Sequence, residues 1–411
     1  MVKILFVHPD LGIGGAERLV VDAALALQNK GHTVRMLTNH HDPNHCFEET
    51  KDGTLDVMTV GDFLPRNIFG KFYAVCAYFR MVYAAFYYVF CLSKTDKYDL
   101  IFIDLISLGI PIFRLAKHSP KILFYCHFPD QLLAKPGGNL KQLYRLPLNY
   151  LEEKTTGQAD GVLVNSKFTS RVFKETFKTL DVIPEVLYPS LNTEYFDQTV
   201  TEDSDTPINI PNDAFVFFSI NRYERKKNLG LALYAFKQLE AYLTKAEWEK
   251  VYLIMAGGYD TRVLENVEHY EELEYLCEEL SLSSKVTFLL SPSDREKLWL
   301  LKRSQVLIYT PSNEHFGIVP LEGMYLHKPV IAVNSGGPTE TIIDDQTGYL
   351  CDANAKEFAK AMLKLVRSQK LLERMGDMGH KRVQQRFSFA AFSDKLDSIV
   401  KNMIQLGRKD K

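Results

Sequence analysis

The chain has 411 residues, of which 46% are hydrophobic and 24% are charged, and its net charge is −2. This length exceeds one ordinary domain of roughly 100–200 residues, so we expect two or three folded units. The near-neutral charge argues against a nucleic-acid binder, and the composition argues against a disordered chain. The six cysteines lack the close pairing of a zinc or redox site, which indicates reduced thiols in the core of a chain that faces the cytosol.

Short apolar runs rich in β-branched and aromatic residues alternate with longer helical patterns through the first half of the chain. This alternation is typical of βαβ units and of a parallel sheet. The predicted strands cover residues 4–8, 34–38, 56–60, 100–105, 122–127, 161–165 and 186–188.

Residues 72–92 interrupt this pattern with nine aromatic side chains and a single charge, Arg80. The segment is long enough to cross a bilayer, which takes roughly 20 residues. A spanning helix, however, would place strands of one sheet on opposite sides of the membrane. We therefore expect a helix that lies in the membrane interface, as the aromatic content and the basic flanking residues suggest. The alternative is a fully buried crossover helix.

The alternation stops in a polar, acidic stretch, residues 197–213, which we interpret as a linker. It resumes with near-continuous apolar runs, as expected of parallel strands buried on both faces, at 216–220, 252–256, 286–290, 306–309 and 330–333. The sequence therefore predicts an α/β protein with two doubly wound, Rossmann-like domains that face each other across a cleft. The expected parts are an N-terminal domain over 1–196, a C-terminal domain over 214–387, and a last helix over 388–411 that packs back on the N-terminal domain.

A glycine-rich turn, residues 10–15, follows the first predicted strand and opens a helix. Gly14 and Gly15 would let backbone N–H groups approach a phosphate or a sugar. The turn is not a dinucleotide fingerprint, because the third glycine of that motif would fall at Glu17. The alternative is a purely structural corner.

A basic loop begins where the predicted strand 216–220 ends, at the sheet edge where α/β proteins bind ligands. It contains four cations within six residues: Arg222, Arg225, Lys226 and Lys227. Such charge suits a diphosphate leaving group, and we select Arg222 and Lys227 as its ligands. The alternative is a solvated charged loop.

Two carboxylates lie around a predicted helix start, Glu314 before it and Glu322 inside it. With a rise of about 1.5 Å per helical residue, the two carboxylates lie on the order of 10 Å apart. The two catalytic carboxylates of a glycosidase lie closer, about 5–9.5 Å apart. The spacing favours two hydroxyl-binding carboxylates on either side of a diphosphate, one for a donor sugar and one for a ribose. The alternative for Glu314 is a helix cap. Further donor-binding candidates are Asn313, Phe316, Gly317 and Ile318 in the same segment, and Gly336 and Gly337 in a second glycine turn.

His127 ends the predicted strand 122–127. A lone histidine is more often a packed side chain than a catalyst, but its place at the ligand edge makes it a candidate for positioning a transferred sugar. Asp203 and Asp205 match a metal-binding pattern, yet they lie in the linker, so we expect no metal.

Taken in order, these motifs resemble those of glycosyltransferase family 4, retaining enzymes of the GT-B fold, along essentially the whole chain. Segments 124–130 and 221–228 resemble in particular the family's α-1,3/α-1,6-mannosyltransferases of dolichol-linked oligosaccharide assembly. The resemblance implies GDP-mannose as donor and mannosyl-chitobiosyl-diphosphodolichol as acceptor in N-glycan precursor synthesis. It also implies membrane association at the cytosolic face of the endoplasmic reticulum, a complex with other dolichol-pathway transferases, and neither a metal nor another cofactor.

On this resemblance, Arg222 and Lys227 hold the diphosphate, Glu314 contacts the mannose, Glu322 contacts the ribose, and His127 positions the sugar. Retention without an obvious nucleophile implies same-face attack, with the donor phosphate helping to take the acceptor's proton. Two alternatives stay open: a family 4 enzyme with a different donor or acceptor, and an inactive paralogue that serves as a membrane-bound scaffold.

Overall fold

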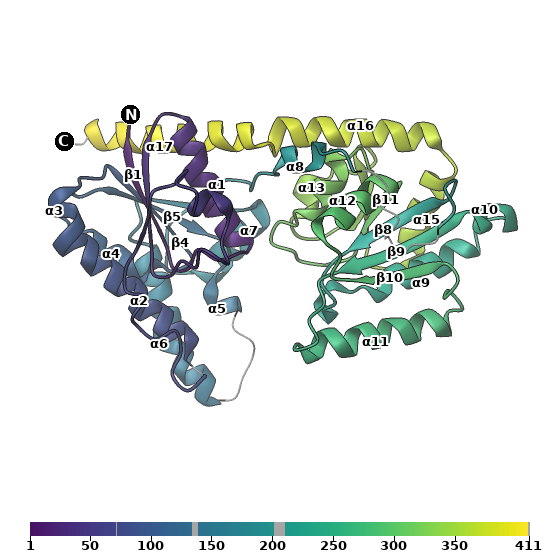
Figure 1. Ribbon diagram of the computed structural model, residues 1–411, viewed down its shortest axis with the longest axis horizontal. Helices are drawn as coiled ribbons and strands as arrows, with labels where there is room; N and C mark the ends of the chain where they lie inside the picture. Colours follow the sequence, from purple (N-terminus) through teal and green to yellow (C-terminus); the bar gives the residue numbers. More distant parts are fainter. Residues whose placement is uncertain (71, 134–138, 201–209, 410–411) are drawn as a thin grey trace. The chain divides into compact units, whose positions relative to one another are not determined.

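The computed structural model describes residues 1–70, 72–133, 139–200 and 210–409. The chain forms two compact units (Figure 1). Unit 1 consists of Met1–Ser190 and Phe389–Lys411, and unit 2 consists of Leu191–Ser388. The central part of the expected linker, with Asp203 and Asp205, lies outside the described residues.

In the described residues, seven parallel strands form the sheet of unit 1 in the order β3-β2-β1-β4-β5-β6-β7. They are β1 (Lys3–His8), β2 (Thr33–Thr38), β3 (Val57–Thr59), β4 (Leu100–Asp104), β5 (Lys121–Cys126), β6 (Gly161–Val164) and β7 (Glu185–Val186). Neighbours along a strand point to opposite faces of the sheet. Phe6 accordingly packs in one buried core and Val7 in another, which explains the continuous apolar runs.

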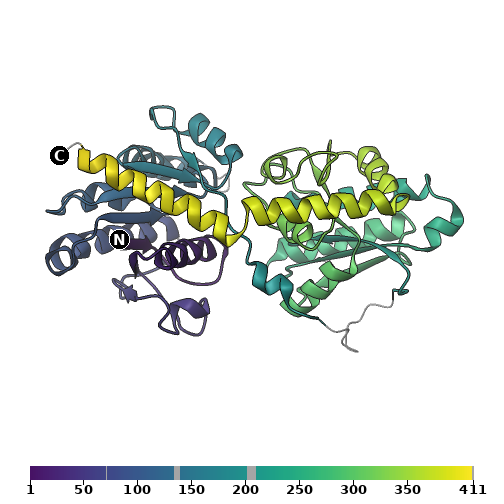
Figure 2. The same cartoon turned by 90° about the horizontal axis from the view of Figure 1, so that it is seen from above.

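Helices cover both faces of this sheet (Figure 1). They are α1 (Gly15–Asn29), α2 (Tyr73–Tyr87), α3 (Ser93–Thr95), α4 (Ile110–Phe113), α5 (Asp130–Leu133), α6 (Asn139–Thr156), α7 (Lys167–Thr176) and α17 (Phe389–Lys409). α17 follows unit 2 in the sequence but packs beside α1 (Figure 2). Its residues Phe392, Leu396 and Val400 are buried in the same core as the apolar face of α1.

One continuous helix, Tyr73–Thr95, is built from α2, a π-helical turn over Tyr88–Leu92, and α3. By length and composition alone it could cross a membrane, and 44% of its most apolar part is buried. Met81 and Ala85 are buried against the sheet, whereas Phe79 and Phe90 are 66% and 58% exposed. The alternative of a fully buried crossover helix is therefore wrong, because one aromatic face is open to solvent.

In the described part of unit 2, six parallel strands form a sheet in the order β10-β9-β8-β11-β12-β13. They are β8 (Phe215–Ile220), β9 (Val251–Gly257), β10 (Val286–Leu290), β11 (Val306–Tyr309), β12 (Val330–Val333) and β13 (Gly348–Cys351). The helices are α8 (Thr193–Asp197), α9 (Gly230–Glu240), α10 (Lys245–Glu249), α11 (Leu264–Glu279), α12 (Asp294–Arg303), α13 (Val319–Tyr325), α14 (Pro338–Thr341), α15 (Ala355–Val366) and α16 (Gln369–Arg386).

The predicted strands correspond to β1–β12, with ends that coincide or differ by at most two residues. β13 was missed: it is a short strand at the edge of the sheet, and its last two residues are only half-buried, so it lacks the continuous apolar run of the central strands. His127 lies one residue beyond β5 rather than inside it. α8 belongs to unit 2, although the sequence had suggested a domain boundary after residue 196, because Tyr325 donates a hydrogen bond from its hydroxyl to Asp197 over 2.8 Å.

Candidate functional site

The structure separates the cations of the basic loop that follows β8. Lys227 lies in a single 3-10 turn, and its side chain is 12% exposed. Its Nζ lies 2.6 Å from Oε1 of Glu314. Arg222, in contrast, is 66% exposed, with its Nη1 3.2 Å from Oε1 of Glu224. Lys227 is therefore fixed in a partly buried ion pair, whereas Arg222 is able to reorient toward a ligand.

The loop between β11 and α13, which contains Glu314, is tied to the segments on either side of it. The Thr310 hydroxyl donates to the backbone oxygen of Lys227 over 2.8 Å. Asn313 adopts a left-handed conformation (φ 56°), which asparagine tolerates better than most residues. Its backbone N–H donates to Oγ of Ser335 over 3.0 Å, and that hydroxyl donates back to Oδ1 of Asn313 over 2.7 Å. Glu314 thus starts from a backbone that is held on both sides.

Two glycines of the turn after β12 let it approach the Glu314 loop closely. At Gly336 (φ 65°), a Cβ atom would lie 2.5 Å from the backbone oxygen of Glu314. At Gly337, it would lie 2.0 Å from the backbone oxygen of Phe316. The N–H of Gly337 donates a hydrogen bond to the backbone oxygen of Glu314 over 2.8 Å. This N–H is therefore not available to bind the sugar donor, although the sequence had suggested that role. These glycines position Glu314 by permitting close contact.

Glu322 lies in the first turn of α13, and its side chain is 8% exposed. Its Oε1 lies 2.7 Å from Nζ of Lys297 on α12. Its Oε2 is buried and has no hydrogen-bond partner among the described residues. Burial raises the pKa of Glu322, and the Lys297 ammonium partly opposes that effect. Because an unpaired buried carboxylate oxygen is costly, Oε2 is suited to accept a hydrogen bond from a ligand hydroxyl.

The residues between these two carboxylates divide into packed and open positions. Phe316 is buried, and its ring centre lies 6.0 Å from that of Phe387. Gly317 has a φ of 78°, and a Cβ atom there would lie 3.0 Å from the Tyr309 hydroxyl. In the part of the chain that the structure describes, the N–H groups of Gly317 and Ile318 have no hydrogen-bond acceptor. Two backbone donors are therefore left between Glu314 and Glu322.

In unit 1, His127 belongs to a chain of ionisable groups. Its Nε2 lies 3.0 Å from Oδ2 of Asp104, the last residue of β4. Oδ1 of Asp104 lies 2.7 Å from Nδ1 of His8, the last residue of β1. Burial alone would lower the pKa of His8, but the carboxylates of Asp104 and Glu17 together raise it to about 10. Burial alone would raise the pKa of Asp104, but His8 and His127 lower it.

The glycine-rich turn before α1 also contacts this chain. A Cβ atom at Gly14 would lie 2.3 Å from Oε2 of Glu17, the end of a flexible side chain that would have to move aside. At Gly15, a Cβ atom would meet no other atom within 4 Å. Oε1 of Glu17 lies 3.8 Å from Nε2 of His8. Glycine at 14 therefore lets Glu17 keep its place near His8, whereas packing does not explain Gly15.

The candidate residues thus form one group in each unit. Unit 2 brings Lys227, Glu314, Asn313 and the two glycines of the second turn into contact, and it places Glu322 beside Lys297. Unit 1 holds His127 and the first glycine turn. Three partners of the candidate residues were not predicted from the sequence: His8, Asp104 and Lys297. His8 ends the predicted strand 4–8, and Asp104 is the last residue but one of the predicted strand 100–105. The rule that selected His127, a place at the carboxyl end of a strand, could therefore have found both, whereas Lys297 lies in an ordinary charged helix without any signal.

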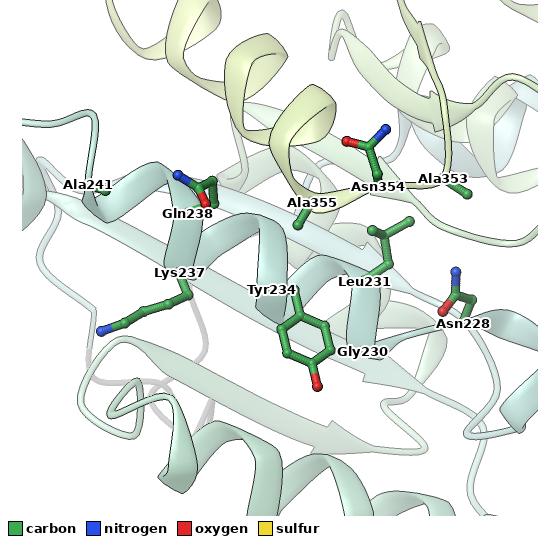
Figure 3. A pocket seen from close by; sticks show the side chains of 10 residues that line it. All are labelled: Asn228, Gly230, Leu231, Tyr234, Lys237, Gln238, Ala241, Ala353, Asn354 and Ala355. Atoms are coloured by element: carbon green, nitrogen blue, oxygen red, sulfur yellow. The ribbon is translucent and has the colours of Figure 1, made fainter.

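Neither a metal cluster nor the pocket of unit 2 coincides with the candidate site in the described residues. The described residues contain no group of three or more His, Cys, Asp or Glu side chains placed to hold a metal ion. A pocket of about 670 Å³ lies between α9 and the start of α15 in unit 2 (Figure 3). Tyr234, Lys237 and Asn354 are among its lining residues, but none of the candidate site residues is. We therefore do not assign this pocket to the site.

Known proteins are similar in sequence along nearly the whole chain. The family model described as Glycosyltransferase Family 4 matches residues 13–195, and that described as Glycosyl transferases group 1 matches residues 200–382. Alpha-1,3/1,6-mannosyltransferase ALG2 of Homo sapiens is 53% identical over 405 residues, which cover 98% of this chain and 96% of the relative. The protein of the same name from Dictyostelium discoideum is 47% identical over 420 residues, which cover 98% of each chain.

Solved structures with the same fold are more distant in sequence. Sucrose-phosphate synthase from Thermosynechococcus elongatus has a TM-score of 0.74 at 20% identity and covers 99% of this chain and 100% of its own. A glycosyltransferase from Rickettsia africae has a TM-score of 0.72 at 22% identity, with 98% of each chain covered. The predicted fold class, α/β with two Rossmann-like domains of the GT-B type, is confirmed.

Proposed function

Because the chain belongs to the family 4 glycosyltransferases and, within them, to the alpha-1,3/1,6-mannosyltransferases, we propose that it transfers mannose from GDP-mannose to a lipid-linked glycan. The identity to the human relative, spread over nearly the whole of both chains, carries this proposal. As a glycosyltransferase, the chain takes its sugar from a nucleotide-sugar donor and gives it to a glycan acceptor. The acceptor in this proposal is mannosyl-chitobiosyl-diphosphodolichol, which receives mannose in α-1,3 and α-1,6 linkage during N-glycan precursor assembly.

The diphosphate of the donor binds to Arg222 and Lys227 in this proposal. Lys227 is already neutralised by Glu314 at 2.6 Å, so the side chain is oriented before the donor arrives. Arg222 is exposed and contributes a second cation that can form paired hydrogen bonds with phosphate oxygens. The open N–H groups of Gly317 and Ile318 supply further donors to the same group. Negative charge that grows on the leaving group is stabilised by these contacts.

The two carboxylates of unit 2 bind hydroxyl groups at either end of the diphosphate. Glu314, which is 24% exposed, accepts hydrogen bonds from the mannose. Glu322 offers its unpaired Oε2 to the ribose while Lys297 keeps Oε1 in place. A hydroxyl group that donates to Oε2 removes the penalty of the unpaired buried oxygen, so the donor gains affinity from it.

The reaction proceeds with retention. The bond between the anomeric carbon of mannose and the phosphate oxygen breaks, and the acceptor oxygen forms its bond on the same face. The acceptor's proton moves to the departing phosphate, while His127 holds the sugar in position. No metal or other cofactor enters this proposal. Near-full activity of Glu314→Gln, or a trapped mannosyl adduct on Glu314, would contradict this mechanism.

Product analysis with the purified full-length chain tests the function. The protein is incubated with a short-chain lipid-linked acceptor and, in separate reactions, with GDP-mannose, UDP-glucose and UDP-N-acetylglucosamine. Mass spectrometry and linkage-specific mannosidases then identify the products. We expect two added mannose residues with GDP-mannose only. Transfer from a UDP-sugar would favour a family 4 enzyme with another donor.

A matched pair of variants separates an enzyme from an inactive scaffold. Lys227→Met removes one diphosphate ligand and should lower turnover by about 10²–10³-fold. Lys237→Met removes an exposed lysine that pairs with Glu240 at 2.6 Å, and turnover should not change. Equal product formation by both variants would contradict the assigned role of Lys227, and no product from the wild type would favour the scaffold.

We also propose that the aromatic face of the Tyr73–Thr95 helix lies in the cytosolic leaflet of the endoplasmic reticulum membrane. Phe79, Phe86 and Phe90 are exposed on it. An apolar pocket of about 410 Å³ lies beside them, lined among others by Leu64 and Phe79. Exposed aromatic and apolar surface of this kind is suited to the boundary between headgroups and acyl chains. A complex with other transferases of the pathway stays a prediction.

Flotation with phosphatidylcholine–phosphatidylserine vesicles tests the membrane face. The double variant Phe79→Asp, Phe86→Asp should float less than the wild type, because two charges would have to enter the interface. The control carries Asp at Tyr234 and Tyr275, which are 50% and 70% exposed in unit 2. Unchanged flotation of the first variant, or an equal loss in the control, would contradict the assignment.

A further inference from the structure

Three neighbouring strands of unit 1 end in a row of ionisable side chains. β1, β4 and β5 are adjacent in the sheet, and their register pairs Val7 with Ile103 and Asp104 with Tyr125. His8 and Asp104 therefore lie side by side at the carboxyl edge, and His127 follows just beyond β5. The contacts are short: 2.7 Å from His8 Nδ1 to Asp104 Oδ1, and 3.0 Å from Asp104 Oδ2 to His127 Nε2.

Burial increases along this row toward the centre. The side chain of His127 is 18% exposed, that of His8 is 1% exposed, and that of Asp104 is fully buried. An isolated carboxylate would not stay charged in such a place, because desolvation disfavours its ionised form. Asp104 has two nitrogen partners, and the partly buried Glu17 stands on the far side of His8. A His8 cation between two carboxylates accounts for how Asp104 stays ionised.

We propose that Asp104 and His8 are positioning residues for His127: the buried His8 cation keeps Asp104 as a carboxylate, and that carboxylate fixes the tautomer and ring orientation of His127. This inference deepens the proposed function, on which the role of His127 in sugar transfer rests. An ionised carboxylate can only accept hydrogen bonds. His127 must therefore carry a proton on Nε2, which leaves Nδ1 with the lone pair in the neutral ring.

The other ring nitrogen is left for the reaction. Among the described residues, Nδ1 of His127 has no protein partner, while the backbone oxygen of His127 accepts a hydrogen bond from Asn165 Nδ2 over 3.0 Å. The ring is thus anchored at Nε2 and at its backbone, and Nδ1 is the nitrogen able to accept a hydrogen bond from a sugar hydroxyl. Glu17 connects this row to the glycine turn, because its carboxylate passes over Gly14.

Ring-nitrogen NMR of the full-length chain with ¹⁵N-labelled histidine tests the proposal directly. At pH 8.5 most histidine rings are neutral, since the ordinary pKa is about 6.5. We expect one ring with both nitrogens protonated, whose signals vanish in His8→Asn. We also expect a ring protonated on Nε2, whose signals vanish in His127→Gln. A proton on Nδ1 of neutral His127, or a neutral His8, would overturn the proposal without any use of activity.

Activity gives the second readout. Asp104→Asn keeps the shape of the side chain but can turn an N–H donor toward His127, which would move the proton to Nδ1. We expect kcat to fall by about 10²-fold while KM for GDP-mannose changes little, as for a misplaced catalytic group. The control is Asp99→Asn, whose carboxylate accepts the Lys3 backbone N–H over 2.8 Å at the opposite end of β4. It should keep wild-type kcat.

The outcomes separate this inference from the proposed function. Unchanged kcat in Asp104→Asn, with an unchanged His127 tautomer, would overturn the positioning role even if the wild type is a mannosyltransferase. If the wild type does not use GDP-mannose, the function fails, but the protonation of His8 and His127 is still measured in the spectrum. If Asp104→Asn does not fold, the wild-type spectrum decides alone.

Discussion

The ion pair between Lys297 and Glu322 should be a measurable source of stability in unit 2. Their charged atoms lie 2.7 Å apart, with side-chain exposures of 24% and 8%. Lys297→Met would leave a buried carboxylate without its counter-charge. Breaking a buried pair in this way costs about 3–5 kcal/mol, and we expect the lower end, because Lys297 reaches some solvent. The free energy of unfolding of unit 2 should thus fall by about 3 kcal/mol.

Urea denaturation followed by tryptophan fluorescence can measure this change. The chain has two tryptophans, Trp248 and Trp299, and both lie in unit 2, so the signal reports that unit. Lys237→Met is the control, because its ion pair is exposed and should contribute at most about 1 kcal/mol.

The double variant Lys297→Met, Glu322→Gln separates the effect of charge from that of side-chain packing. An amide at 322 needs no counter-charge, so most of the lost stability should return. The single variant should also be less destabilised at pH 5 than at pH 8, because protonation of Glu322 removes the unpaired charge. The reasoning is refuted if the single variant loses no more stability than the control, or if the double variant is as unstable as the single one.

Three other changes follow from the geometry. Gly336→Ala should destabilise unit 2 by several kcal/mol, because its Cβ would lie 2.5 Å from a backbone oxygen, whereas Gly31→Ala in unit 1, also at positive φ but with nothing within 4 Å, should destabilise its unit by only about 1–2 kcal/mol. Urea denaturation followed by circular dichroism reports both units, and similar losses in the two variants would contradict the close contact at Gly336. Glu314→Gln should lower kcat by about 10²-fold in the mannose-transfer assay, because the Glu314 carboxylate contacts the sugar in the transition state. A change in KM alone would show that Glu314 contributes only to binding of the nucleotide sugar. Between pH 7 and pH 10, the free energy of unfolding of unit 1 should fall more steeply in the wild type than in His8→Asn, by up to roughly 1.4 kcal/mol per pH unit. The pKa of His8 is raised to about 10, so its contribution to stability is complete below the ordinary pKa of about 6.5 and is lost as the pH rises toward 10. Parallel pH profiles would show that His8 is not a buried cation.

The sheets were predictable because burial on both faces leaves a direct mark on the sequence. Leu5 and Val7 pack on one side of β1 and Ile4 and Phe6 on the other, so the strand appears as an unbroken apolar run. The sidedness of the Tyr73–Thr95 helix was not predictable in the same way. Tyr88 and Phe90 are both aromatic, yet the first is 1% exposed and the second 58%. Composition alone does not distinguish the packed face of such a helix from its exposed face.

The sequence predicted which residues belong to the candidate site, but not which of them contact each other. Lys227 and Glu314 each follow a strand at the ligand edge, and that rule selected both. Their ion pair joins positions 87 residues apart, which only the folded sheet brings together. The second glycine turn, with Gly336 and Gly337, was expected to bind the nucleotide-sugar donor through its N–H groups. The N–H of Gly337 instead donates a hydrogen bond to the Glu314 backbone. A local motif cannot show which of its groups another loop already occupies.

The path of the chain also sets an order for folding during synthesis. Unit 2 is one uninterrupted stretch, Leu191–Ser388, so it can complete its core before α17 is made. Unit 1 cannot, because Leu396 and Val400 of α17 fill the space beside α1. Roughly 200 residues separate the two parts of unit 1, which takes on the order of ten seconds or more to translate at about 5–20 residues per second. During that interval the apolar side of α1 is uncovered, and we expect nascent chains to need a chaperone there, although this unit is the first to leave the ribosome.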